Sequence, residues 1–183
     1  MKRILIVMTT TILLIGCSDN GGIVELVEND SQISFITTKA TSKTINTETV
    51  IKSDSEETGD FIFDIGNSDI TIKGMLEFPG YTALEQNEIS VLLQSSDIKY
   101  ANIDLSSQIQ ELNKPLCLTL KFSGLNINEG DLIDFNYKNE NDEFKDIEYG
   151  RLIVDYDSGW ALVIKAKLYQ FSKVGFTVKE KLN

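Results

Sequence analysis

Histidine is absent from this sequence of 183 residues, and its absence excludes several kinds of chemistry. The chain has no Ser-His-Asp or Cys-His nucleophile, no imidazole base and no histidine ligand for a metal. Phosphate-binding loops of the G-x-x-x-x-G-K-[ST] and G-x-G-x-x-G types are also missing, as is the G-x-S-x-G nucleophile elbow. We therefore expect a protein that is not an enzyme and that needs no cofactor.

Basic residues are few. The chain has 17 Lys and Arg against 28 Asp and Glu, which gives a formal net charge of −11. A nucleic-acid partner is excluded on this ground, because nucleic-acid binding needs a basic face to neutralise phosphates. Hydrophobic residues make up 42% of the chain, which is typical of a globular protein rather than a disordered or polytopic one.

The N-terminus has the pattern of a signal peptide. Lys2 and Arg3 precede an apolar run over residues 4–15. As a helix this run would span about 18 Å, too little for a hydrocarbon core of about 30 Å. It fits the apolar region of a signal peptide instead. The run ends in Leu14-Ile15-Gly16-Cys17, which resembles the lipobox of bacterial lipoproteins.

The lipobox resemblance implies that residues 1–16 are removed by cleavage between Gly16 and Cys17, and that Cys17 carries a thioether-linked diacylglycerol. The membrane would then be a partner through this lipid, with residues 17–22 as a short tether. Ser18 follows the cysteine, and in Gram-negative lipoproteins this favours the outer membrane; otherwise the location is the cell membrane. The alternatives are an ordinary secretory signal with an incidental cysteine, or an uncleaved anchor.

Cleavage would make the protein more acidic. Loss of Lys2 and Arg3 leaves 15 basic and 28 acidic side chains, a net charge of −13 over 167 residues. An anionic protein is repelled by an anionic bilayer, so we expect the lipid to hold it there.

The body of the chain is patterned as strands. Short segments in which apolar and polar residues alternate recur every 10–15 residues, separated by Gly, Asn, Asp and Ser. They are residues 33–37, 44–51, 61–65, 70–73, 89–93, 116–122, 133–137, 160–168 and 174–178, with a turn at Asn67-Ser68-Asp69. We predict an all-β fold, an immunoglobulin-like antiparallel β-sandwich over residues 23–181. Two halves that meet near residues 106–113 are the alternative.

One segment has helical spacing. Leu105, Ile109 and Leu112 are four and three residues apart, Asp104 is a suitable N-cap, and Pro115 follows. We predict one short helix over residues 104–113.

Cys117 is the second cysteine. In the strand predicted for residues 116–122, Leu116, Leu118, Leu120 and Phe122 share one face, so Cys117 lies on the less apolar face. Acylation of Cys17 would leave it without a disulfide partner, and it has no His or CxxC partner for thiol chemistry. We expect Cys117 to be a small structural residue.

Five stretches of the C-terminal half carry a family resemblance: Lys114–Leu116, Leu118–Leu120, Ser123–Leu125, Asp157–Trp160 and Leu168–Val174. Together they resemble the β-sandwich domain shared by zonula-occludens proteins, ankyrins and netrin receptors. Related domains occur in bacterial surface lipoproteins.

Some members of this family cleave themselves at a His-Phe-Ser sequence. The serine attacks the preceding carbonyl, and the histidine acts as the base. This chain has Gln170-Phe171-Ser172 at the corresponding place, which keeps the nucleophile and lacks the base. The resemblance therefore implies a chain that stays intact.

Two loops are rich in oxygen ligands that Ca²⁺ prefers. Asn126, Asn128 and Asp131 lie in one loop, and Asp155 and Asp157 flank another turn. The spacing of a known calcium loop is absent, so we name them as candidates and expect no metal site.

The sequence leaves three functions open. We predict a non-catalytic binding or structural module, whose partner is an envelope protein or a polysaccharide. An accessory protein that binds carbohydrate or Ca²⁺ is the alternative; Tyr100, Tyr137, Tyr149 and Tyr156 would then form an exposed row for glycan stacking. A hydrolase that uses two carboxylates is the third possibility, since such chemistry needs no histidine.

Overall fold

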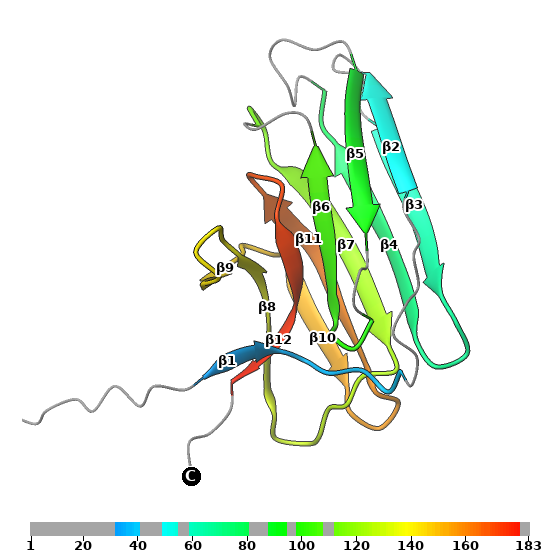
Figure 1. Cartoon of the computed structure of the whole chain (residues 1–183), viewed down its shortest axis with the longest axis vertical. Helices are drawn as coiled ribbons and strands as arrows, with labels where there is room; N and C mark the ends of the chain where they lie inside the picture. Colours follow the sequence, from blue (N-terminus) through cyan, green and yellow to red (C-terminus); the bar gives the residue numbers. More distant parts are fainter. Residues whose placement is uncertain are drawn as a thin grey trace, which may run out of the picture.

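The computed structural model describes residues 32–40, 49–54, 59–80, 88–94, 98–107 and 112–179. In these residues, strands form two antiparallel sheets (Figure 1). The seven-stranded sheet holds β1 (Ile33–Phe35), β2 (Thr49–Asp54), β5 (Glu88–Gln94), β6 (Asn102–Ser107), β8 (Leu132–Lys138), β9 (Phe144–Asp146) and β12 (Lys173–Lys179). The five-stranded sheet holds β3 (Gly59–Gly66), β4 (Thr71–Phe78), β7 (Leu116–Ser123), β10 (Arg151–Asp155) and β11 (Trp160–Leu168).

Strands distant in sequence are neighbours in both sheets. The seven-stranded sheet has the order β2-β5-β6-β12-β8-β9, and β1 also pairs with β12. The other sheet has the order β10-β11-β7-β4-β3. Each sheet thus joins strands from before and after residues 106–113. The predicted all-β antiparallel sandwich is confirmed.

The core lies between the two sheets. Phe122 of β7 and Phe176 of β12 are fully buried, and their ring centroids are 6.1 Å apart in an edge-to-face arrangement. Phe135 of β8 packs on Phe176 in the same way, at 5.1 Å. Burial of such side chains is the main stabilising contribution in a sandwich.

The alternation predicted for residues 116–122 is confirmed in β7. Leu116, Leu118, Leu120 and Phe122 are fully buried, and Cys117, Thr119 and Lys121 are half-buried. The other face of β7 is therefore the outer face of its sheet.

Asn67 forms the predicted turn between β3 and β4. Its Oδ1 accepts hydrogen bonds from the backbone N–H groups of Asp69 at 2.8 Å and of Ile70 at 3.0 Å. An asparagine side chain that bonds its own backbone in this way replaces a backbone turn. The pairing of β3 with β4 confirms the hairpin.

Unbroken alternation over residues 160–168 predicts one buried face made of Trp160, Leu162, Ile164, Ala166 and Leu168, and this prediction is wrong in its first half. Ala161 and Val163 are buried there, whereas Ile164 is half-buried. A β-bulge lies between Val163 and Ala166, and Lys165 within it has a φ of 56°. One extra residue moves the inward positions from odd to even numbers, because strand side chains alternate with a period of two.

The helix predicted for residues 104–113 is wrong. Residues 104–107 form the end of β6 and pair with β5, and residues 112 and 113 are not helical; residues 108–111 lie outside the described part. Leu105 is buried beside Ile103 of the same core. Residues 104–107 therefore form a strand, despite the helical spacing of the apolar residues, because they pair with β5 and β12. Tertiary context overrides the local pattern here.

The predicted signal peptide and tether, with Gly16 and Cys17, lie outside the described residues. In the part of the chain that the structure describes, no helix has the length and apolar character needed to cross a membrane.

Candidate functional site

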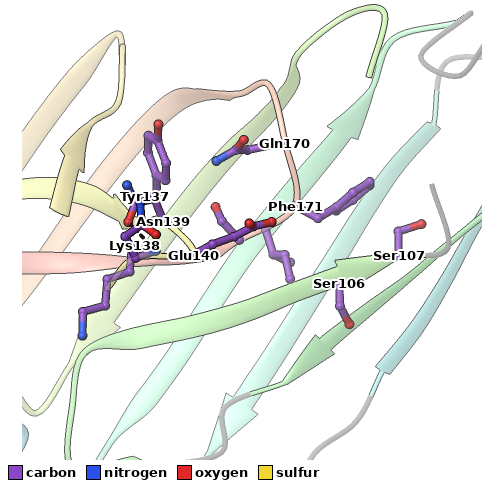
Figure 2. Close-up of a pocket in the computed structure, with 11 residues that line it drawn as sticks. Ser106, Ser107, Tyr137, Lys138, Asn139, Glu140, Gln170 and Phe171 are labelled. Carbon is purple, nitrogen blue, oxygen red and sulfur yellow. Dashed lines mark hydrogen bonds between the residues drawn. The ribbon is translucent and has the colours of Figure 1, made fainter. Parts of the chain in front are cut away.

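A gap in the seven-stranded sheet opens into a large hollow. β12 begins at Lys173, which lies opposite Asp104 of β6 and Lys138 of β8. β6 runs on to Ser107. Beyond Lys173, no residue of β12 separates β6 from the β8–β9 hairpin, and a pocket of about 790 Å³ opens there. We call it the notch pocket; Leu105–Ser107, Tyr137–Asn141 and Gln170–Ser172 line it (Figure 2).

The lining of the notch pocket is polar with two aromatic rings. The lining residues with hydroxyl groups are Ser106, Ser107, Ser172 and Tyr137, and those with amide side chains are Asn139, Asn141 and Gln170. Lys138 and Glu140 are charged, and Tyr137 and Phe171 carry the aromatic rings. Hydroxyls and amides both donate and accept hydrogen bonds. Such a lining recognises a ligand that carries neutral polar groups.

The β8–β9 turn is a defined wall of this pocket. Asn139 Oδ1 accepts hydrogen bonds from the backbone N–H groups of Asn141 at 3.0 Å and Glu143 at 2.9 Å. Lys138 Nζ lies 2.9 Å from a carboxylate oxygen of Asp142, and this hydrogen bond lowers the pKa of Asp142. The sequence analysis assigned no role to residues 139–141, so they were missed as part of a site.

The Gln170-Phe171-Ser172 segment lies at the base of the notch pocket. The Ser172 carbonyl accepts a hydrogen bond from Leu105 N–H at 3.1 Å, which fixes the segment to β6. In Figure 2 the Gln170 side chain extends toward Tyr137, and Phe171 extends the opposite way. The predicted resistance to self-cleavage stays a prediction; the charged side chains that line the pocket with Ser172 are Lys138 and Glu140.

A second hollow of about 320 Å³ adjoins the notch pocket. It shares Tyr137, Gln170 and Ser172 with the notch pocket. An ion pair between Lys167 and Glu148, at 2.6 Å, lies at this hollow and raises the pKa of Lys167 through its hydrogen bond. The connection from β11 to β12 therefore contributes to both hollows.

The candidate calcium ligands in the first loop make hydrogen bonds of the fold. Asp131 Oδ2 accepts from Asn128 N–H at 2.7 Å, and Asn126 Nδ2 donates to the Thr38 carbonyl at 2.7 Å. Tyr156 OH donates to the Asp131 carbonyl at 3.0 Å and links the two loops.

In the second loop, Asp155 Oδ1 accepts from Ser158 N–H at 2.8 Å, and this bond lowers the pKa of Asp155. Asp157 is exposed in the same turn. Within the described ranges, no three Asp, Glu or Cys side chains gather in a way that could hold a metal ion.

The exposed tyrosine row that the carbohydrate-binding alternative would use does not form. Tyr137, Tyr149 and Tyr156 pack against the core, and Tyr100 alone of the four is exposed. Tyr149 OH donates to Asp134 Oδ1 at 2.8 Å. The hydroxyl groups of Tyr149 and Tyr156 therefore make hydrogen bonds within the fold.

Cys117 lies half-buried on the outer face of β7, as predicted. Burial, and next the negative charge of Glu77, raises the pKa of its thiol. A raised pKa lowers the fraction of reactive thiolate, which is consistent with a structural role.

The chain matches no protein-family model, no curated protein and no solved structure. Its function is therefore inferred from its own residues.

Proposed function

We propose that this protein is a lipid-anchored module of the cell envelope that binds a ligand without transforming it. The anchor is the lipidated Cys17 implied by the lipobox, and the binding site is the notch pocket. The single observation that carries the proposal is the lining of that pocket, in which hydroxyls, amides and two rings surround a hollow of about 790 Å³.

The anchor has its own test. Cys17→Ala should move the protein from the membrane fraction to the soluble fraction or leave an uncut precursor, because two acyl chains supply the stable attachment. Cys117→Ala is the matched control and should stay with the membrane. A Cys17→Ala protein that matures normally and still sediments with membranes contradicts the anchor.

The binding site is tested by cosedimentation with envelope fragments from which the lipid has been extracted, so that the anchor of the protein does not contribute. Gln170→Ala should reduce the affinity about tenfold, since loss of one hydrogen-bonding group costs about 1 kcal/mol or more. Ser68→Ala, in the β3–β4 turn, is the control. The proposal fails if the wild-type protein does not bind, or if Gln170→Ala binds equally well.

A carbohydrate-binding accessory protein is the second candidate. Three amide side chains and the rings of Tyr137 and Phe171 favour it, because sugars offer neutral hydroxyls and an apolar C–H face. Binding of purified envelope polysaccharide, but not envelope protein, would identify this candidate.

A further inference from the structure

Asn102 is buried, and its side chain makes no hydrogen bond with any residue that the structure describes. Four polar residues are buried in the described part of the chain, and the side chains of Thr38, Asn136 and Thr177 all make hydrogen bonds. Asn102 is 5% exposed, and no described residue bonds its side-chain amide. An amide has two donor hydrogens and one acceptor oxygen, and leaving these unpaired in a buried position is unfavourable. Such a group requires an explanation.

The position of Asn102 is fixed by the backbone around it. It lies opposite Gly175 of β12, and a Cβ on Gly175 would be 2.8 Å from the Asn102 Cα. The neighbouring Ile103 points into the core, so Asn102 points to the outer face of the seven-stranded sheet.

A groove of about 410 Å³ lies on that outer face, and Asn102 lines it. The other lining residues are Ile33–Phe35, Tyr100, Lys138, Phe144 and Lys173. Tyr100 lies just before β6, and the others come from β1, β8, β9 and β12, which lie together with β6 in Figure 1. We call it the Asn102 groove.

Three aromatic rings form the apolar wall of the groove. The rings of Phe35 and Phe144 meet edge to face, with centroids 4.8 Å apart. Tyr100 is 41% exposed, so its ring is available to a ligand. A flat apolar face, such as the C–H face of a sugar ring, stacks on a wall of this kind.

The two lysines leave the groove close to neutral. Lys138 Nζ is 2.9 Å from Asp142, and Lys173 Nζ is 3.5 Å from Asp104. Each ammonium has three donor hydrogens, so donors remain for hydroxyl or ring oxygens. Because these charges are balanced and the whole chain carries −11, a neutral ligand fits better than an anionic one.

We propose that the Asn102 groove binds an N-acetylhexosamine unit of a polysaccharide. The acetamido group offers one N–H and one C=O, which pair with the oxygen and the NH₂ of the Asn102 amide. Its methyl group and the sugar ring contact the aromatic wall, and the lysine donors meet sugar oxygens. Lys138 lines both this groove and the notch pocket, whereas Asn102 and Tyr100 line the groove alone. Variants of Asn102 and Tyr100 therefore test this inference separately from the anchor and the notch pocket.

The test is calorimetric titration of the full-length protein with two β-1,4-linked trisaccharides. One is the trimer of N-acetylglucosamine; the other, cellotriose, lacks the acetamido groups. The wild-type protein should bind the acetylated trimer at least tenfold more tightly. No binding of that trimer, or equal binding of both, overturns the proposal.

Two variants locate the binding site. Asn102→Leu should weaken binding of the acetylated trimer at least tenfold and should melt at or above the wild-type temperature, because it removes an unpaired buried amide. Tyr100→Ala should weaken binding at least fivefold, and Ile62→Ala, exposed on the other sheet, is its control. If Asn102→Leu does not fold, Tyr100→Ala decides: unchanged affinity overturns the proposal.

A peptide could offer the same amide chemistry. N-acetyl-diglycine is therefore titrated alongside the sugars. Sugar binding in preference to this peptide supports the proposal, and binding of the peptide at equal or higher affinity overturns it.

Discussion

Tyr149 shows how one hydroxyl ties a loop to the seven-stranded sheet. Its OH donates to Asp134 Oδ1 at 2.8 Å. Burial, and next the hydrogen bond with Asp134, raises the pKa of Tyr149 from 10.0 to about 12. A raised pKa means that the folded protein holds this proton more tightly than the unfolded chain does.

Tyr149→Phe should therefore destabilise the protein at pH 8 and lose its effect at high pH. The expected cost at pH 8 is about 1 kcal/mol, for one hydrogen bond to a carboxylate in a half-exposed place. The stabilising contribution is complete below pH 10 and disappears as the pH rises through about 12.

Urea unfolding of both proteins at pH 8 and at pH 11.5 measures this difference. Tyr169→Phe, whose side chain is 60% exposed, is the control and should change little at either pH. If Tyr149→Phe lowers the free energy of unfolding equally at pH 8 and at pH 11.5, the proposed role of the Tyr149 hydroxyl is wrong.

At the scale of the element, close backbone contact defines the centre of the seven-stranded sheet. A Cβ on Gly175 would clash with the Ala101 carbonyl oxygen and would lie 2.8 Å from the Asn102 Cα. Both are backbone atoms of the strand beside it, so they cannot move without disturbing the β6–β12 pairing.

Gly175→Ala should lower the free energy of unfolding by about 1–3 kcal/mol, since overpacking of this size is not relieved by a rotamer change. Alanine also has less conformational freedom than glycine in the unfolded chain, which stabilises the folded protein by about 0.4–1 kcal/mol and offsets only part of this cost. Gly150→Ala is the milder comparison, because its Cβ would lie 3.3 Å from its nearest atom, the Ile164 carbonyl oxygen, and a small shift relieves that contact. Chemical denaturation measures the free energy of unfolding of the two variants. Equal values would show that the backbone of β6 shifts at little cost to accommodate the added methyl group.

Sequence patterns identified strands well where the period of two was unbroken. β7 has this pattern along its whole length, and its buried face was predicted residue by residue. The bulge at Lys165 in β11 could not be predicted from the sequence. It depends on the register in which β11 pairs with β7, and the local composition of β11 does not show that register. The end of β6 was mistaken for a helix because its pairing with β5 leaves no trace in the spacing of its own residues.

The candidate sites were predictable only in part, for the same reason. Gln170-Phe171-Ser172 was found from its resemblance, and it lies in the notch pocket. Asn102 gave no local signal: its burial depends on β1, β9 and β12, which come from distant parts of the chain. A site assembled from pairing across a sheet is not visible in a linear pattern.

At the scale of the whole molecule, the excess of acidic side chains opposes folding. The chain carries −11, and ion pairs such as Lys73–Asp64, at 2.7 Å, join exposed side chains. Each exposed pair contributes at most about 1 kcal/mol. Repulsion among the remaining carboxylates acts over longer distances and favours the unfolded chain.

Added salt should therefore stabilise the protein. The screening length falls from about 30 Å at 0.01 M to less than about 10 Å above 0.1 M, so long-range repulsion is screened more strongly than contact pairs are. We expect the melting temperature at pH 7.5 to rise by several degrees between 0.01 and 0.5 M NaCl, at about 2–4 °C per kcal/mol for a chain of this size. Near pH 4, where about half of the carboxylates are protonated, the same salt should have little effect. A melting temperature that falls with NaCl at pH 7.5 would mean that the exposed ion pairs outweigh the repulsion, and that the acidic surface stabilises this fold.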